Sequence, residues 1–166
     1  MSNRGMTGLD GGVAGLVGAA TIAIWFLFMD AVTRLPLYTP SVLGEGFLLR
    51  EPGLVLNPRE QDSVKLTLMY SGVHGLVFIV LGVFAAYVFL IFTRKLHLGV
   101  ILIVLFAVLE LGFIGTAFIV AKPVLDELAW PIVLTGNFLA AAGMASYLWL
   151  RLRSSDVGLG GPIARL

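Results

Sequence analysis

Three polar side chains, Glu110, His74 and Asn137, stand inside long apolar stretches and have the types that perform chemistry within membranes. Glu110 lies in the middle of the run ILIVLFAVLELGFIGTAFIV, residues 101–120. A lone carboxylate near the centre of a bilayer costs at least a few kcal/mol, so it needs a partner or a function. Such groups mark proton pathways, cofactor sites or polar contacts between helices.

The depths of these residues predict that they share one layer. At 1.5 Å per residue, Glu110 lies about 18 Å from the inner start of its segment, His74 about 20 Å and Asn137 about 18 Å from the same side. Trp25 falls at a similar level. We therefore predict an intramembrane polar cluster of His74, Glu110 and Asn137. Depth does not fix the direction of a side chain, so a structural cluster, a contact with a partner protein, and a cofactor, quinone or proton site all stay open.

The composition is that of an integral membrane protein. Of the 166 residues, 58% are hydrophobic and only 13% are charged, against about 25% charged in soluble domains. Cysteine is absent, which excludes disulfides and Cys-ligated metal clusters. The net charge of +1 gives no reason to expect a nucleic-acid partner.

Spanning the hydrocarbon core takes about 20 apolar residues as helix, and four segments meet this requirement. We predict an all-α integral membrane protein, one domain over 1–166, with four transmembrane helices in an antiparallel bundle. A long outer loop, 31–66, joins the first two helices. The expected spans are about 12–30, 67–92, 98–121 and 129–150.

The long loop contains features of its own. Its apolar part LPLYTPSVLGEGFLL, residues 35–49, is interrupted by prolines and glycines, so we expect no continuous helix there. We expect it to lie along the outer interface or to pack on a neighbour. The sequence NPRE, residues 57–60, predicts that the second helix begins near Pro58, outside the membrane.

Loop charges predict the orientation. With the N-terminus inside, the cytoplasmic side holds six basic and two acidic residues, and the outer side five basic and seven acidic ones. Cytoplasmic loops carry the excess of positive charge, so both termini are expected in the cytoplasm.

Small residues predict faces for helix contact. Gly11, Gly15, Ala19 and Ala23 recur every four residues in the first span, and Asn137, Ala141 and Ala145 do so in the fourth. Such ridges let helices approach closely in lipid. Their partner is either another helix of this bundle or a different subunit.

Few catalytic or metal-binding arrangements fit this sequence. His74 and His97 lie too far apart in depth to ligate one haem, although a single-histidine site for haem or chlorophyll at His74 is a hypothesis. We find no phosphate-binding loop, zinc pattern or nucleophile constellation. We therefore expect no enzyme, no metal site and no catalytic residue.

Three segments carry a resemblance to other proteins. The segments are GLVGAATIAIWFLFMDAVTRLPLYTPSVLG (15–44), YSGVHG (70–75) and WPIVLTGNFLAAAGMASYLW (130–149). Taken together, they resemble small uncharacterised four-span proteins of bacterial inner membranes. The resemblance implies a bacterial inner-membrane location and the four-span layout, and it implies no activity.

The abundance of contact surface favours a non-catalytic accessory subunit that stabilises a larger bacterial membrane complex. The favoured host is a respiratory or photosynthetic electron-transfer assembly, and the expected partners are other membrane subunits and lipids. No bound cofactor is expected. The alternative is a haem-, chlorophyll- or quinone-binding membrane protein that uses His74 with Glu110. A third hypothesis is a small oligomeric transporter.

Overall fold

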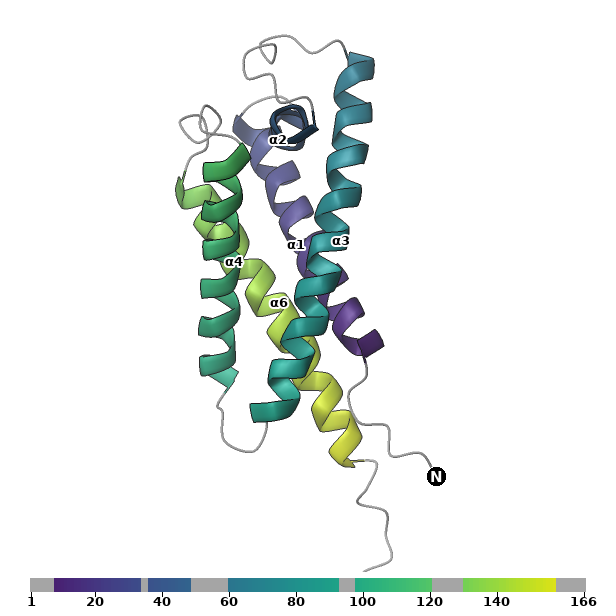
Figure 1. Ribbon diagram of the computed structural model, residues 1–166, viewed down its shortest axis with the longest axis vertical. Helices are drawn as coiled ribbons and strands as arrows, with labels where there is room; N and C mark the ends of the chain where they lie inside the picture. Colours follow the sequence, from purple (N-terminus) through teal and green to yellow (C-terminus); the bar gives the residue numbers. More distant parts are fainter. Residues whose placement is uncertain (1–7, 34–35, 49–59, 93–97, 121–129, 158–166) are drawn as a thin grey trace, which may run out of the picture.

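In the part of the chain that the structure describes, the fold is a bundle of four long helices that run up and down along a common long axis. A computed structural model describes residues 8–33, 36–48, 60–92, 98–120 and 130–157. In Figure 1, α1 and α4 run one way, α3 and α6 run the opposite way, and the short α2 crosses one end. The helix bounds are α1 Gly8–Thr33, α2 Tyr38–Leu48, α3 Glu60–Phe92, α4 Leu98–Val120 and α6 Trp130–Val157.

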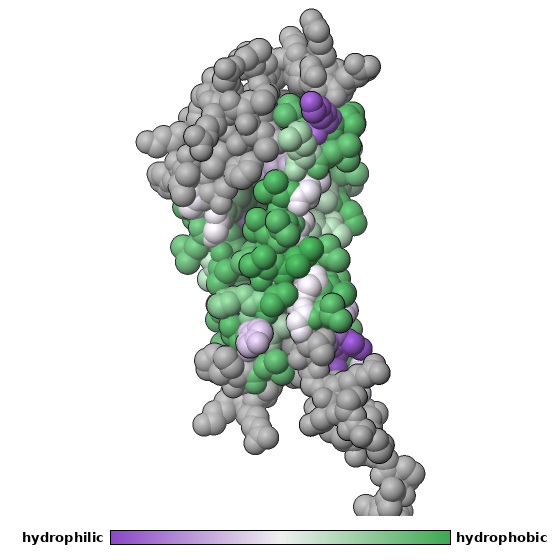
Figure 2. All heavy atoms as spheres, turned by 45° about the vertical axis from the view of Figure 1, so that its right-hand side comes forward, coloured by the Kyte–Doolittle hydropathy of each residue, from purple (hydrophilic) through white to green (hydrophobic). Residues whose placement is uncertain are grey.

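The described chain is all-helical, as expected, with three long apolar helices and one shorter apolar helix. Stretches long and apolar enough to cross a membrane lie at Gly8–Thr33, Val64–Val88 and Trp130–Arg151. The third expected span, 98–121, corresponds to α4, whose apolar stretch Gly99–Gly115 is shorter. Figure 2 shows hydrophobic residues across the middle of one face, with the most hydrophilic described residues towards its two ends. This pattern is typical of a multi-pass membrane protein.

Helices α1 and α3 pack with their backbones in contact. A Cβ atom on Gly15 would overlap the backbone carbonyl group of Phe78, and one on Gly11 would lie 2.6 Å from Cα of Val83. From the other side, a Cβ on Gly82 would overlap the backbone of Gly11 and Gly15. Only glycine fits at these three positions without moving a helix, so the small residues set the distance between α1 and α3.

Helix α6 forms the centre of the apolar core. Its buried stripe faces α1 on one side and α4 on the other. A Cβ on Gly18 of α1 would meet Met144 Sδ at 2.6 Å and Phe78 Cδ1 at 2.9 Å, so α1, α3 and α6 converge there. Helix α4 makes its extensive contacts with α6. The buried α6 stripe consists of Ala140, Ala141, Met144, Ala145 and Leu148.

Helix α2 corrects one expectation. The segment 35–49 was expected to lack a continuous helix, yet residues Tyr38–Leu48 are helical. Pro40 occupies the first turn, where a backbone N–H has no acceptor within the helix, so the ring is tolerated. A Cβ on Gly44 would lie 2.8 Å from the carbonyl oxygen of Leu66. The glycine therefore permits close packing on α3 rather than ending the helix.

Asp30 and Ser41 fix α2 in place. Buried Asp30, near the end of α1, accepts hydrogen bonds from the backbone N–H of Thr39 at 2.8 Å and from its hydroxyl at 2.6 Å. A carboxylate at a helix N-terminus also interacts favourably with the helix dipole. Ser41 Oγ forms a further hydrogen bond, 3.1 Å long, with Thr67 Oγ1 of α3. These contacts bind α2 to both neighbouring helices.

Some expected features fall on residues outside the described ranges. Helix α3 begins at Glu60, and Pro58, where its start was expected, is not among the described residues. The links between the expected second, third and fourth spans also lie outside the described ranges, at 93–97 and 121–129.

The glycine contact gives a test of the fold. We expect Gly15→Ala to lower the free energy of unfolding by about 1–3 kcal/mol, because the new methyl group must push α1 away from α3. Gly12→Ala is the matched control, since its Cβ would meet only Ile79 at 3.9 Å. The control should be neutral or stabilising by up to about 1 kcal/mol, because alanine favours helix. Unfolding in detergent micelles measures both, and equal effects would contradict the proposed packing.

Candidate functional site

The structure places Glu110, halfway along α4, in contact with Asn137, about a quarter of the way along α6. Asn137 Nδ2 of α6 donates a hydrogen bond to Glu110 Oε1 of α4 at 3.0 Å. Asn137 is buried, with 6% of its surface exposed, whereas Glu110 is partly exposed at the edge of the α4–α6 contact. Two members of the expected polar cluster are therefore joined across a helix interface.

Aromatic rings lie close to this pair. Phe106 stands one turn before Glu110 on α4, and Phe138 follows Asn137 on α6. Their rings meet edge to face, with centroids 6.0 Å apart. A second edge-to-face pair, Phe113 and Trp130, joins the same helices with centroids 6.2 Å apart. The hydrogen bond thus lies within an aromatic contact that attaches α4 to α6.

His74, the third expected member, lies elsewhere. It is on α3, where its ring stacks with Tyr70 at a centroid distance of 5.7 Å and tilts against Phe78 at 4.6 Å. Its Nε2 atom is buried and has no hydrogen-bond partner among the described residues. Helix α3 packs mainly on α1 and α2, and among the described residues no hydrogen bond joins His74 to Glu110 or Asn137.

The environment of His74 bears on cofactor binding. A haem iron or a chlorophyll magnesium would have to bond a ring nitrogen directly, and Nε2 is covered by protein. Ligation there would need neighbouring side chains to move. Among the residues that the structure describes, no group of three or more His, Asp or Glu side chains is placed to hold a metal ion.

The expected contact ridges are used within the chain. Gly11, Gly15 and Ala19 of the first ridge are buried, and both glycines face α3, but Ala23 is exposed. In the second ridge, Asn137, Ala141 and Ala145 are all buried. Gly136, beside that ridge, faces α1, because a Cβ there would lie 2.8 Å from Trp25 Cδ1.

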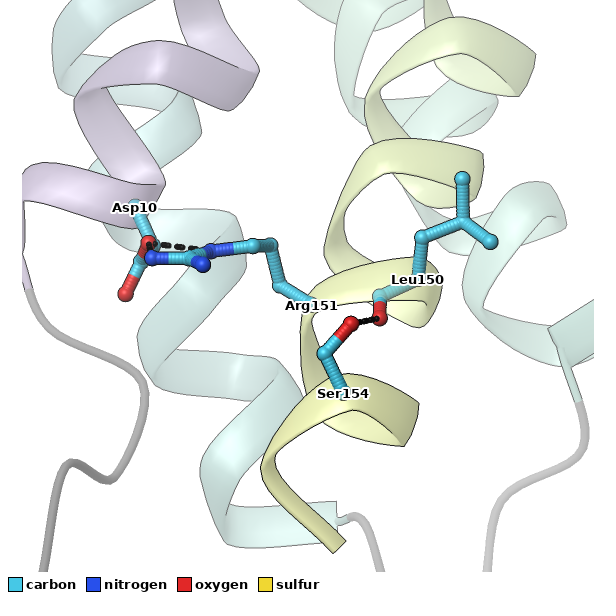
Figure 3. A network of polar contacts seen from close by, with 4 residues as sticks. All are labelled: Asp10, Leu150, Arg151 and Ser154. Atoms are coloured by element: carbon cyan, nitrogen blue, oxygen red, sulfur yellow. Dashed lines mark hydrogen bonds and ion pairs between the residues drawn. The ribbon is translucent and has the colours of Figure 1, made fainter. Parts of the chain in front are cut away.

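An ion pair at one end of the bundle was not predicted. Arg151 Nη2 of α6 lies 2.6 Å from Asp10 Oδ1 of α1, and Arg151 Nε donates to the same oxygen at 2.8 Å (Figure 3). Asp10 is buried, whereas the Arg151 side chain is 55% exposed. The loop charges could have predicted this ion pair, because they place both residues at the cytoplasmic end of the bundle, where their charges are opposite. In the next turn, the hydroxyl group of Ser154 donates a hydrogen bond to the backbone carbonyl oxygen of Leu150, within α6 itself.

Trp25 forms a further contact between α1 and α6. Its indole Nε1 donates a hydrogen bond to the backbone carbonyl oxygen of Ile132 at 2.8 Å. Trp25 was expected at the depth of Glu110, and its recorded partner is this carbonyl group. The sequence gives no signal for such a bond, since any backbone carbonyl could accept it.

Comparison with protein-family models, curated proteins and solved structures found no match to this chain. The resemblance to four-span proteins of bacterial inner membranes therefore stays a prediction.

The Glu110–Asn137 contact predicts a measurable coupling. In a double-mutant cycle of Glu110→Leu and Asn137→Leu, we expect an interaction energy of about 0.6–1 kcal/mol, the size of interhelical hydrogen bonds in membranes. Unfolding of each variant in mixed micelles supplies the four values. Thr135→Ala is the control partner, because exposed Thr135 bonds only Pro131 of its own helix. A coupling indistinguishable from that of Thr135→Ala with Glu110→Leu would contradict the contact.

Proposed function

We propose that this protein is a non-catalytic accessory subunit of a larger bacterial membrane complex. In this proposal α1, α3, α4 and α6 cross the inner membrane as four antiparallel spans, and both termini lie in the cytoplasm. The single observation that carries the proposal is the partial exposure of Glu110, a carboxyl group halfway along α4.

The exposed carboxyl group calls for a polar neighbour. Asn137 is its hydrogen-bond partner among the described residues, and a carboxyl group has capacity for further bonds. In the bilayer, lipid chains cannot supply them, so an unpaired carboxyl group at this depth is costly. A polar or basic side chain on a helix of another subunit would supply the missing interaction.

The buried acids of the described residues contrast with the partly exposed Glu110. Asp10 is paired with Arg151, and Asp30 with Thr39, inside the chain. Both lie near helix ends and hold neighbouring helices together. Glu110 differs because it lies at mid-helix and remains partly exposed, which is the arrangement that supports a partner outside the bundle.

The proposed host is a respiratory or photosynthetic electron-transfer assembly. A host that carries its own redox groups would need only packing surface from this chain. The long apolar helices and the polar contacts that fix them supply such a surface.

A second candidate function uses His74. Its buried Nε2 atom without a partner favours a site where the imidazole bonds a haem, a chlorophyll or a quinone after a local rearrangement. In that case the purified protein would carry a visible or near-ultraviolet absorption band that is lost in His74→Phe. Colourless protein free of quinone would contradict this candidate.

Tagged protein extracted in mild detergent tests the accessory-subunit proposal. We expect stoichiometric co-purification of larger membrane proteins with the wild type, identified by mass spectrometry. Glu110→Leu should lose these partners because it removes the polar contact. Glu110→Gln should keep them because the amide still forms hydrogen bonds.

Leu68→Ala serves as the control, since it changes an exposed apolar residue on α3, away from the α4–α6 contact. Circular dichroism confirms that each variant retains its helices. A monodisperse monomer without partners would refute the proposal. So would equal partner recovery from Glu110→Leu and the control.

A further inference from the structure

A groove of about 250 Å³ lies between α3 and α4, with α6 beneath it. Its floor is made of buried residues, including Ala85 of α3, Leu105 of α4 and Met144 of α6. Its rim is open, because Phe84 and Val104 are 58% and 46% exposed. Every residue that lines it is apolar. The groove thus offers an apolar ligand a closed base and an open side.

The length of the groove fits one leaflet of a bilayer. On α4 the lining residues run from Val100 to Leu109. Nine residues of helix rise about 14 Å. Half of a bilayer's hydrocarbon core is about 15 Å thick. The groove therefore begins near the start of α4 and ends near the depth of the membrane centre.

The length of the groove distinguishes between a transmembrane helix and a lipid acyl chain as its occupant. A transmembrane helix of another subunit needs a contact along about 20 residues to cross the whole core. It is also about 10–12 Å wide with its side chains. A single acyl chain is thinner and ends at the membrane centre, as the groove does. Met144 at the base is a flexible side chain that adapts to a mobile chain.

The sequence that links the two groove-lining helices is basic. The five residues between the end of α3 and the start of α4 read TRKLH and include Arg94 and Lys95. Two basic residues in this link give it a charge complementary to the phosphate group of a phospholipid. A neutral hydrocarbon would gain nothing from them.

We propose that this groove binds one acyl chain of a phospholipid from the cytoplasmic leaflet, which the protein retains as a bound lipid. The inference rests on the proposed membrane-spanning layout but not on the partner contact at Glu110. On α4, Glu110 is turned about 190° from the middle of the groove face, at 100° per residue, so the two sites are separate.

Native mass spectrometry of detergent-purified protein tests the proposal. We expect one phospholipid per chain on the wild type, and recovery of that species when delipidated protein is titrated with phosphatidylglycerol. Val104→Phe should lose it, because the larger ring fills the open side of the groove. Ile103→Phe is the matched control: the same ring is added one residue away, at an exposed position outside the groove.

Cysteine labelling supplies a second measurement. The chain contains no cysteine, so Val104→Cys and Ile103→Cys each introduce a single thiol. Added phosphatidylglycerol should slow maleimide labelling of Val104→Cys and leave Ile103→Cys unchanged.

Three results would overturn the proposal. The first is an absence of bound lipid on the wild type. The second is equal lipid binding to the wild type, Val104→Phe and Ile103→Phe, which would show only surface lipid. The third is a co-purifying membrane protein, without lipid, that Val104→Phe displaces. Loss of partners in Glu110→Leu with lipid retained would show that the two proposals stand separately.

Discussion

The arrangement of the helices depends on the backbone contact between α1 and α3. Gly11 and Gly15 on one side and Gly82 on the other leave no room for side chains between the two helices. In lipid, close packing of this kind replaces the hydrophobic effect as the force that joins helices. Because α1 lies so close to α3, the side chains of Phe78 on α3 and Met144 on α6 both pack over Gly18. The glycine contact thus fixes the distance between the first pair of helices and also the place where the third one packs.

Polar contacts secure the other helices to this pair. Two hydrogen bonds join α1 to α6 near opposite ends of α6, from Arg151 to Asp10 and from Trp25 to Ile132. Because they lie far apart along α6, they resist sliding and rotation of α6 against α1. Helix α4 depends on α6, through the Glu110–Asn137 bond and edge-to-face rings. Since α4 is held from one side, its face towards α3 is left free to line the groove. The two candidate sites therefore arise from one feature, the one-sided attachment of α4.

Depth along a helix could be predicted from the sequence, whereas direction around it could not. Glu110 and Asn137 share a level and meet, but His74, at a similar predicted level, forms no hydrogen bond with them and has its ring contacts within its own helix, with Tyr70 and Phe78. Rotation also explains the first ridge. Residues four apart advance by about 40° at 3.6 residues per turn, so Ala23 is turned about 120° from Gly11 and lies exposed. The sequence does not predict helix α2, because proline and glycine usually interrupt helices. In the structure Pro40 lies in the first turn, and Gly44 lies in a close contact with α3.

The apolar groove and the Glu110 carboxyl group differ in what exposure to lipid costs in free energy. An apolar groove open to the bilayer costs little, because lipid chains are as apolar as the leucines that line it, and nothing drives α3 and α4 together to close it. A partly exposed carboxyl group at mid-helix is costly until a polar group reaches it. The groove can therefore exchange its occupant with the surrounding lipid, whereas Glu110 favours a lasting contact. Among the described residues, the buried acids Asp10 and Asp30 are paired inside the chain, so Glu110 at the α4–α6 edge is the acid whose environment would improve most with a further polar neighbour.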